Sequence, residues 1–151
     1  MRKSLFLITA CLISIRIFAA SPITLYDLRC ENLINPIGID NASPHFSWKI
    51  RSQSPTQQKY YEIQVASDSL QLTKNKADVW SSGKVKSSAS VMVPYKGKAL
   101  ESRQLCYWRV RVWSKKGKSA WSAVSRFAIG ILENDKLGGA YIGLAPGNGD
   151  V

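Results

Sequence analysis

Residues 105–121, LCYWRVRVWSKKGKSAW, are the stretch that decides the fold. Successive side chains in this stretch alternate in character. The apolar or small set comprises Cys106, Trp108, Val110 and Val112. The set that holds the charged side chains comprises Leu105, Tyr107, Arg109, Arg111 and Trp113. Period-two alternation predicts a half-buried strand. Turn residues follow at 115–118, so we expect a hairpin whose second strand begins near Trp121.

Short segments on both sides of this stretch show the same alternation. They lie at residues 24–32, 44–50, 60–67, 79–85, 90–95 and 122–129. Turn signals rich in Pro, Gly, Asn and Asp separate them, for example at 35–38 and 40–44. About seven short strands without a sustained helical period predict an all-β, immunoglobulin-like β-sandwich. We place this domain at residues 21–131. Between two of the strands, residues 68–77 predict a loop or a single helical turn.

The two ends of the chain do not fit the strand pattern. Residues 1–20 combine Arg2 and Lys3 with an apolar run over 5–15 and small residues before Ser21, as in a secretory signal peptide. We therefore expect a secreted or periplasmic protein, with a lipoprotein modified at Cys11 as the alternative. The apolar run is shorter than the roughly 20 residues that span a bilayer. Residues 132–151 are rich in glycine and predict a linker or the start of a following domain.

The chain is strongly basic, with a formal net charge of +11. Removal of residues 1–20 takes away three basic residues and no acidic one, which leaves +8. Most of the excess lysines fall in predicted turns, where charge is ordinarily solvated. The sequence has no recognition helix, zinc-finger spacing or ribonucleoprotein motif, so we expect no nucleic-acid partner. An acidic polysaccharide is the more plausible polyanion.

Two cysteines, Cys30 and Cys106, follow the predicted signal peptide. Both fall on the inward face of their predicted strands. Export permits a disulfide between them. Buried free thiols are also common for cysteine. We favour free thiols, and the disulfide remains the alternative because connectivity cannot be deduced from sequence.

Catalytic chemistry has little support in the residues. His45 is the single histidine, which leaves no base for a nucleophilic triad and no set of spaced metal ligands. Glycoside cleavage ordinarily uses two facing carboxylates, whereas the acidic residues here are scattered singly. A glycine-rich phosphate loop is absent. We therefore predict no catalytic residue, metal or cofactor.

The outward face of the central strand offers the one candidate surface. Arg109, Arg111, Trp113 and Trp121 form a structural ladder of cation–π contacts in one interpretation. In the other, aromatic rings stack on sugars, and the candidates are Tyr107, Trp113, Trp80 and Trp121. We favour the ladder, because cross-strand pairs ordinarily stabilise sheets.

Four segments together resemble a known family. They are LRCENLINPIGIDNASPHFSWKI (28–50), YYEIQVAS (60–67), VWSSGKV (79–85) and LCYWRVRVWSKKGKSAWS (105–122). They are similar to the amino-terminal, fibronectin type III-like module of bacterial α-L-rhamnosidases. In that family, carbohydrate-binding and catalytic domains follow the module, and the enzymes hydrolyse terminal rhamnose with inversion.

The resemblance implies a scaffold or docking module without activity of its own, whose partners are the downstream domains. Rhamnose-containing or acidic polysaccharide is a further partner that it implies. The family's catalytic acids lie far downstream, so the chain is expected to be truncated before its catalytic domain. A free-standing secreted glycan- or surface-binding module is the alternative, and a fragment of a disrupted gene is another.

Overall fold

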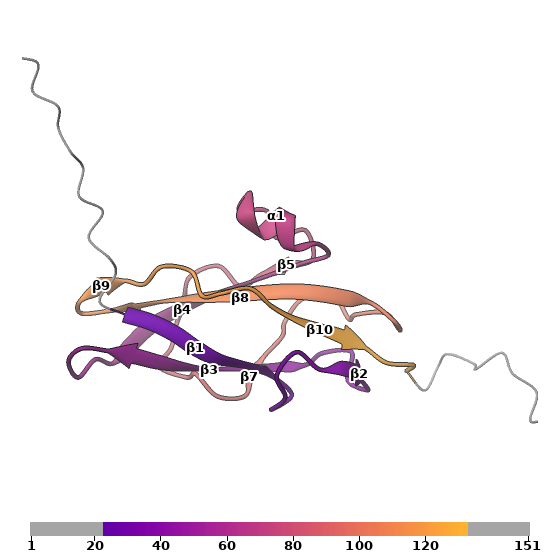
Figure 1. Cartoon of the computed structure of the whole chain (residues 1–151), viewed down its shortest axis with the longest axis horizontal. Helices are drawn as coiled ribbons and strands as arrows, with labels where there is room; N and C mark the ends of the chain where they lie inside the picture. The colour runs from indigo at the N-terminus through magenta and orange to yellow at the C-terminus, as the bar shows by residue number, and fades with distance from the viewer. Residues whose placement is uncertain (1–22, 133–151) are drawn as a thin grey trace, which may run out of the picture.

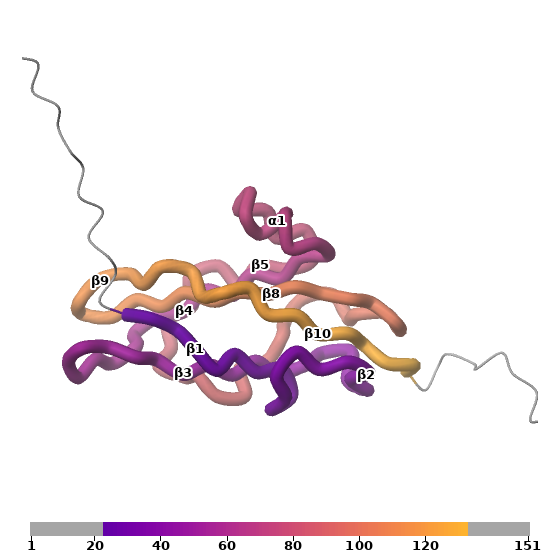
Figure 2. The backbone as a smooth tube through the Cα atoms, viewed as in Figure 1, coloured from indigo at the N-terminus to yellow at the C-terminus, as the bar shows by residue number. Residues whose placement is uncertain are grey.

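The computed structural model describes residues 23–132, which form two packed β-sheets (Figures 1 and 2). The smaller sheet has the order β1 (Ile23–Cys30), β3 (His45–Ser52) and β7 (Val93–Pro94). The larger sheet has the order β2 (Ile37–Ile39), β10 (Ser125–Ile129), β8 (Leu105–Ser114), β4 (Gln58–Ala66) and β5 (Trp80–Ser81). In addition, β6 (Val85–Lys86) pairs with β4, and β9 (Gly117–Lys118) pairs with β8. The predicted immunoglobulin-like sandwich is confirmed.

The long strands β4 and β8 form the centre of the larger sheet. They pair antiparallel from Gln58 opposite Ser114 to Ala66 opposite Tyr107. As the alternation predicts, one face of β8 points into the sandwich: Cys106, Trp108, Val110 and Val112 are all at most 1% exposed. On β4, Ile63 and Val65 are likewise fully buried. The period-two pattern therefore assigns both faces of this pair correctly.

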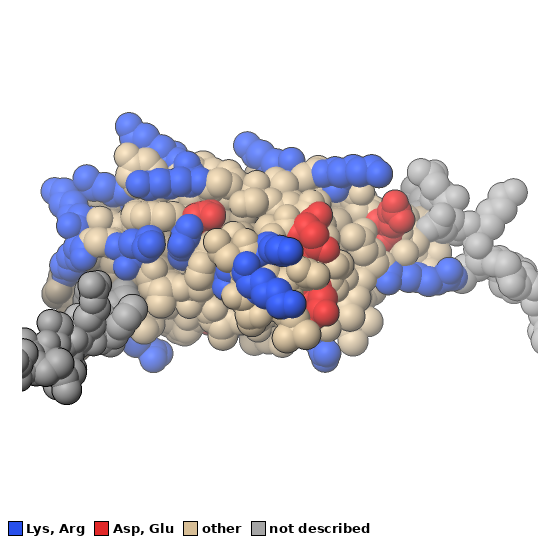
Figure 3. Space-filling model, turned by 90° about the horizontal axis from the view of Figure 1, so that it is seen from above, with Lys and Arg blue, Asp and Glu red and all other residues tan. Residues whose placement is uncertain are grey.

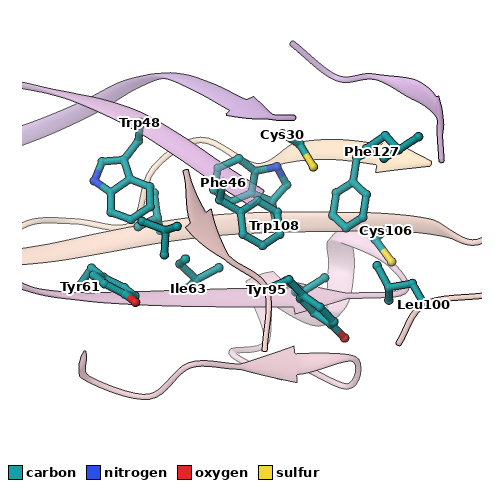
Figure 4. Close-up of a cluster of buried hydrophobic side chains, with 14 of the residues drawn as sticks. Cys30, Phe46, Trp48, Tyr61, Ile63, Tyr95, Leu100, Cys106, Trp108 and Phe127 are labelled. Atoms are coloured by element: carbon teal, nitrogen blue, oxygen red, sulfur yellow. The ribbon is translucent and has the colours of Figure 1, made fainter. Parts of the chain in front are cut away.

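Aromatic rings from both sheets fill the space between them (Figure 4). Phe46 of β3 contacts Trp108 of β8 with ring centroids 4.5 Å apart, and it meets the edge of Phe127 at 5.7 Å. Trp48 packs edge-to-face on Tyr61 at 5.5 Å. Such pairs contribute about 0.5–1.5 kcal/mol beyond the area they bury. The core is thus an aromatic layer that joins β3 to β4, β8 and β10.

The two buried tryptophans differ in their polar atoms. The Trp48 Nε1–H donates to Gln58 Oε1 at 3.1 Å. Gln58 is itself buried, and its Nε2 donates to the carbonyls of Ser87 and Ala89. The Trp108 Nε1–H has no hydrogen-bond partner within residues 23–132. The indole of Trp48 is therefore held by a hydrogen bond as well as by packing, and the indole of Trp108 is held by packing alone.

A β-bulge in β1 keeps its apolar residues on the core side. Two residues of β1 stand between the pairs Tyr26–Lys49 and Arg29–Ser47, where β3 has one. Asp27 occupies the bulge at φ 49°. Its carboxylate contacts Lys49 Nζ at 2.8 Å and Arg29 Nε at 2.9 Å, and these cations, Lys49 foremost, lower the pKa of Asp27.

Two local predictions need correction, and a third is confirmed. The sequence predicts only a turn at 35–38, whereas the structure has the parallel edge strand β2, because Ala128 N donates to Pro36 O and Gly130 N to Ile39 O. The single predicted strand at 79–85 is two short strands joined through Gly83 at φ +59°. The single helical turn is α1 (Ser69–Thr73), whose Leu72 is fully buried although the segment is poor in apolar residues.

Cys30 and Cys106 are buried free thiols that come from opposite sheets (Figure 4). The structure therefore agrees with the favoured alternative and lacks the disulfide. Burial raises the pKa of Cys30 well above its usual range, and burial together with the charge of Asp78 raises the pKa of Cys106 to about 11. The predicted signal peptide and the glycine-rich tail lie outside the described residues. Within residues 23–132, no helix has the length and apolarity to cross a bilayer.

Candidate functional site

The outer face of the larger sheet is the face that the sequence singles out. It points away from the smaller sheet, and α1 stands over part of it (Figure 1). The odd-numbered residues of β8 lie on this face. Arg109 among them is only 8% exposed. The middle of this face is therefore covered by its own chain, whereas Leu105 at the start of β8 is 42% exposed.

Cations and aromatic rings alternate across this face. The guanidinium carbon of Arg109 lies 4.2 Å from the ring centroid of Trp121, and that of Arg111 lies 4.3 Å from the same ring. Arg111 also lies 5.1 Å from the ring of Trp113. We call Arg109, Trp121, Arg111 and Trp113 the Arg–Trp ladder. Beyond it, Lys84 Nζ lies over the rings of Trp113 and Tyr60, at 5.0 and 4.6 Å.

Two serines hold Trp121 against β8. Ser119 N donates to Val112 O while Ser119 Oγ accepts from Val112 N, at 2.9 and 3.0 Å. Ser122 repeats the pattern with Val110, at 2.9 and 3.1 Å. The hydroxyls thus supply acceptors that strand carbonyls would supply in a regular sheet. The expected strand at Trp121 is therefore wrong, because β9 ends at Lys118 and β10 begins at Ser125.

Polar partners fix both arginines of the ladder. Arg109 donates from Nε and Nη2 to Gln64 Oε1 at 3.1 and 2.8 Å, and from Nη2 to Asn75 Oδ1 at 3.0 Å. Burial, followed by the charge of Arg111, lowers the pKa of Arg109. Arg111 forms a salt bridge with Glu62 at 2.7 Å. The guanidinium groups therefore stack on rings and hydrogen-bond sideways at the same time, an arrangement that suits arginine better than lysine.

The ladder fits a structural role better than a sugar platform. Ring faces that would stack on a sugar already contact guanidinium groups, and Trp121 contacts two of them. Tyr107 lies farther along β8, opposite Ala66 and Arg126. No ring or cation contact joins it to the ladder in the part of the chain that the structure describes. The structure therefore brings together four of the predicted residues and leaves Tyr107 apart.

Trp80 does not belong to the outer face. It pairs with Val65, whose side chain points into the core, so the side chain of Trp80 shares that side of the sheet. Its ring packs edge-to-face on the buried Tyr95 at 4.9 Å. The Tyr95 hydroxyl donates to Lys98 O at 2.9 Å, and Gly97 passes so close that a Cβ there would overlap the phenol. Trp80 is thus part of the rim of the core, which removes it from the glycan-stacking candidates.

Sequence reasoning missed the side chains that anchor the ladder. They are Tyr60, Glu62, Gln64, Asn75 and Lys84. Glu62 and Gln64 could have been found by register, since they stand opposite Arg111 and Arg109 on β4. Asn75 follows α1 and comes close only through the tertiary fold.

Groups for catalysis or metal binding do not converge in residues 23–132. No cluster of three or more His, Cys, Asp or Glu side chains could hold a metal ion there. The His45 Nδ1 lies 3.1 Å from Glu31 Oε1, which also accepts from His45 N and from Asn41 Nδ2. This cluster ties the start of β3 to the turn after β1, which is a structural function.

The immunoglobulin-like sandwich that carries the Arg–Trp ladder has relatives among known proteins. Residues 25–133 match the family model described as the Rha78A-like, N-terminal immunoglobulin domain. The match covers most of the chain, which therefore belongs to this domain family.

Several relatives of the chain are named alpha-L-rhamnosidase. The chain is 45% identical over 116 residues to an alpha-L-rhamnosidase of Alteromonas sp. (strain LOR), covering 75% of this chain and 12% of that protein. It superposes on the alpha-L-rhamnosidase of Streptomyces avermitilis, solved in complex with L-rhamnose, with a TM-score of 0.68 and 40% identity; the match covers 72% of this chain and 10% of that one. For alpha-L-rhamnosidase from Dictyoglumus thermophilum, the TM-score is 0.72 and the identity 38%, and the match covers 77% of this chain and 13% of that one.

The chain thus spans between 10% and 13% of the length of these relatives. The part it matches is their amino-terminal immunoglobulin-like module. The predicted resemblance is confirmed, and the chain is an immunoglobulin-like module of the kind found at the amino terminus of α-L-rhamnosidases.

Proposed function

We propose that the chain acts as a docking module that packs against the domain following it in an α-L-rhamnosidase-like glycoside hydrolase. The chemistry of that enzyme, hydrolysis of terminal rhamnose with inversion, belongs to the downstream domains. Export to the periplasm or the medium, and a rhamnose-containing or acidic polysaccharide as the outer partner, are parts of this proposal.

An apolar row beside the exit of the chain carries the proposal. Ala128 of β10 stands between Ile37 of β2 and Leu105 of β8, and all three side chains face outward, since Phe127 and Ile129 face the core. Ile37 is 82% exposed, and Leu105 and Ile131 are each 42% exposed. We call Ile37, Leu105, Ala128 and Ile131 the exit row.

The position of the exit row identifies its occupant. Ile131 is the penultimate described residue, so the chain leaves the sandwich directly beside this row (Figure 1). In the relatives, most of the protein lies outside the matched module. Contiguous exposed apolar side chains mark surfaces for association. A following domain would meet the exit row first and would remove it from water.

A chimera tests the docking. Residues 23–132 replace the matched module of the Streptomyces avermitilis enzyme, and calorimetry follows its unfolding. The I37D/L105D variant is expected to separate the melting of the module from that of the rest. The matched control is L70D/V91D, which changes two exposed apolar residues away from the row. Equal melting behaviour of the two variants contradicts docking at the row.

Activity is measured separately on the isolated chain. We expect no release of nitrophenol from a nitrophenyl α-L-rhamnoside, because the chain matches only the immunoglobulin-like module, which makes up 12% of the Alteromonas enzyme. Hydrolysis by the isolated chain would overturn the non-catalytic assignment whatever the chimera shows.

A further inference from the structure

We infer that four lysines at the other end of the sandwich form a binding site for an anionic polysaccharide. They are Lys59, Lys86, Lys115 and Lys116, and we call them the lysine trough. They lie near Ser114, at the end of β8 opposite to Leu105. Nine residues of strand separate the two positions, which is roughly 30 Å at the rise of a β-strand. This inference is therefore independent of docking at the exit row.

Two adjoining hollows form the trough. One has a volume of about 500 Å³ and is lined by Lys59, Lys86, Gln57, Tyr60, Ser87 and Ser88, together with Gln58. The other, of about 420 Å³, is lined by Lys59, Gln57, Thr56, Pro55, Lys115 and Lys116. Because Gln57 and Lys59 border both hollows, the two hollows adjoin each other. Two adjoining hollows suit an extended chain better than a single compact ligand.

The walls of the trough are fixed before any ligand binds. Gln58 is buried beneath it and accepts from Trp48 of the core. The Nε2 of the same residue donates to Ser87 O and Ala89 O, which holds the segment after β6 against the start of β4. Tyr60 pairs with Lys86 in the register of β4 and β6. Such preorganisation lowers the entropic cost of binding.

Positive charge in the trough is not compensated. None of the residues that line the two hollows is acidic. Within residues 23–132, Lys59, Lys86 and Lys115 have no ion-pair partner, and Lys116 contacts the hydroxyl of Ser54. Glu62, the nearest carboxylate along β4, is already bound to Arg111. Figure 3 shows basic residues gathered toward this end of the face in view, with acidic ones toward the middle and the opposite end. Uncompensated charge in a hollow concentrates anions.

The remaining lining residues favour a sugar chain over a membrane surface. Side-chain hydroxyls and amides suit sugar hydroxyls as hydrogen-bond partners, and Gln57, Thr56 and Ser88 supply them. The large apolar side chains that the structure exposes line neither hollow. A membrane-binding surface would combine its lysines with such groups. The shared chemistry is thus carboxylate or sulfate groups carried on a polysaccharide.

Two variants of equal net charge test the site. K59E/K86E/K115E/K116E reverses the trough, and K74E/K76E/K96E/K98E reverses four exposed lysines outside it. Titration calorimetry with polygalacturonate and with dextran sulfate is run at about 50 mM and about 200 mM salt. Neutral dextran is the ligand control. Thermal melting first shows that both variants fold.

We expect the wild-type chain to bind at least one polyanion, and to bind it more weakly at the higher salt. The trough variant should bind about 100-fold more weakly, and the control variant within about threefold of wild type. Equal losses in both variants would show that overall charge binds the polymer and would overturn the site. Binding only to vesicles rich in phosphatidylserine, or no binding at all, would also overturn it.

Discussion

The two faces of β8 bury side chains by different means. On the inner face, Trp108 and its neighbours are buried by apolar contacts with the smaller sheet. On the outer face, Arg109 is buried by contacts with the ring of Trp121 and with the side-chain amides of Gln64 and Asn75. These residues belong to the same sheet or to the segments beside it. Alternation in the sequence therefore predicts which face of the strand is apolar and which is polar. It does not predict how exposed to solvent each face is.

The two faces of β8 also differ in how much they contribute to the free energy of unfolding. Burial of a large apolar side chain is worth about 1.5–3 kcal/mol. An exposed cation–π contact contributes about 0.5–1 kcal/mol, and a desolvated one about 2. We therefore expect the inner face to dominate the stability of the domain, with the ladder adding smaller and more local contributions.

Truncation of one tryptophan on each face tests that ranking most directly. Trp108→Ala should lower the free energy of unfolding by about 3–5 kcal/mol, because it opens a cavity between Phe46 and β8. Trp121→Ala should lower it by about 1–2 kcal/mol, through the loss of two guanidinium contacts. Urea denaturation measures both. Equal losses would show that the outer face is a second core of the same strength.

A gentler substitution separates packing from hydrogen bonding within the inner face. Trp48→Phe and Trp108→Phe remove the same atoms. The first also leaves the buried Gln58 Oε1 without its donor, so it should cost about 1–3 kcal/mol more than the second. Trp108→Phe removes an indole N–H that has no partner within the described residues. Denaturation midpoints of the two variants supply the comparison, and a larger cost for Trp108→Phe would contradict it.

The charged residues of the outer face allow a matched pair of variants. Arg109→Met retains a long side chain but leaves Gln64 Oε1 and Asn75 Oδ1 without the donor they share. We expect it to cost about 2 kcal/mol. Arg111 is more exposed than Arg109, so Arg111→Met, which leaves Glu62 without its ion-pair partner, should cost only about 1 kcal/mol. Raising the salt concentration should reduce the second cost and leave the first almost unchanged, because salt screens exposed charges best.

The inner face responds to alkaline pH through its thiol. The raised pKa of Cys106, about 11, means that the unfolded chain loses this proton first as the pH rises. The stability that the neutral thiol contributes is therefore complete below the ordinary cysteine pKa and is lost as the pH rises through about 11. The loss is about 1 kcal/mol per pH unit. Cys106→Ala should flatten the dependence measured by denaturation between pH 9 and about 11. Burial also raises the pKa values of Cys30, Tyr61 and Tyr95. These groups therefore make the free energy of unfolding depend on pH in the wild type and in the Cys106→Ala variant alike.

Local pattern was enough to predict the central strands and their faces. It failed where a distant segment decides the outcome. Ile37 belongs to a strand only because β10 arrives beside it, and Trp80 faces the core only because β5 pairs with Val65. Residues around Trp121 alternate like a strand, yet serine hydroxyls replace the strand bonds there.

The candidate surfaces also differ in how far the sequence predicts them. Four ladder residues were predicted because one alternating stretch contains them. The lysine trough unites residues from the start of β4, from β6 and from the turn after β8. Each of these lysines looks in sequence like an ordinary solvated charge, so only the fold reveals that they line adjoining hollows. The exit row is scattered in the sequence for the same reason.

The parallel pairing of β2 with β10 has a mechanical consequence. The described ends of the chain, Ile23 and Leu132, lie at opposite ends of the sandwich (Figure 1). A pulling force applied through them runs along the axes of β1 and β10. Hydrogen bonds from β3, β8 and β2 then resist it in shear, with many bonds loaded at once instead of one after another. A load applied at these two ends is therefore shared among many strand hydrogen bonds of residues 23–132.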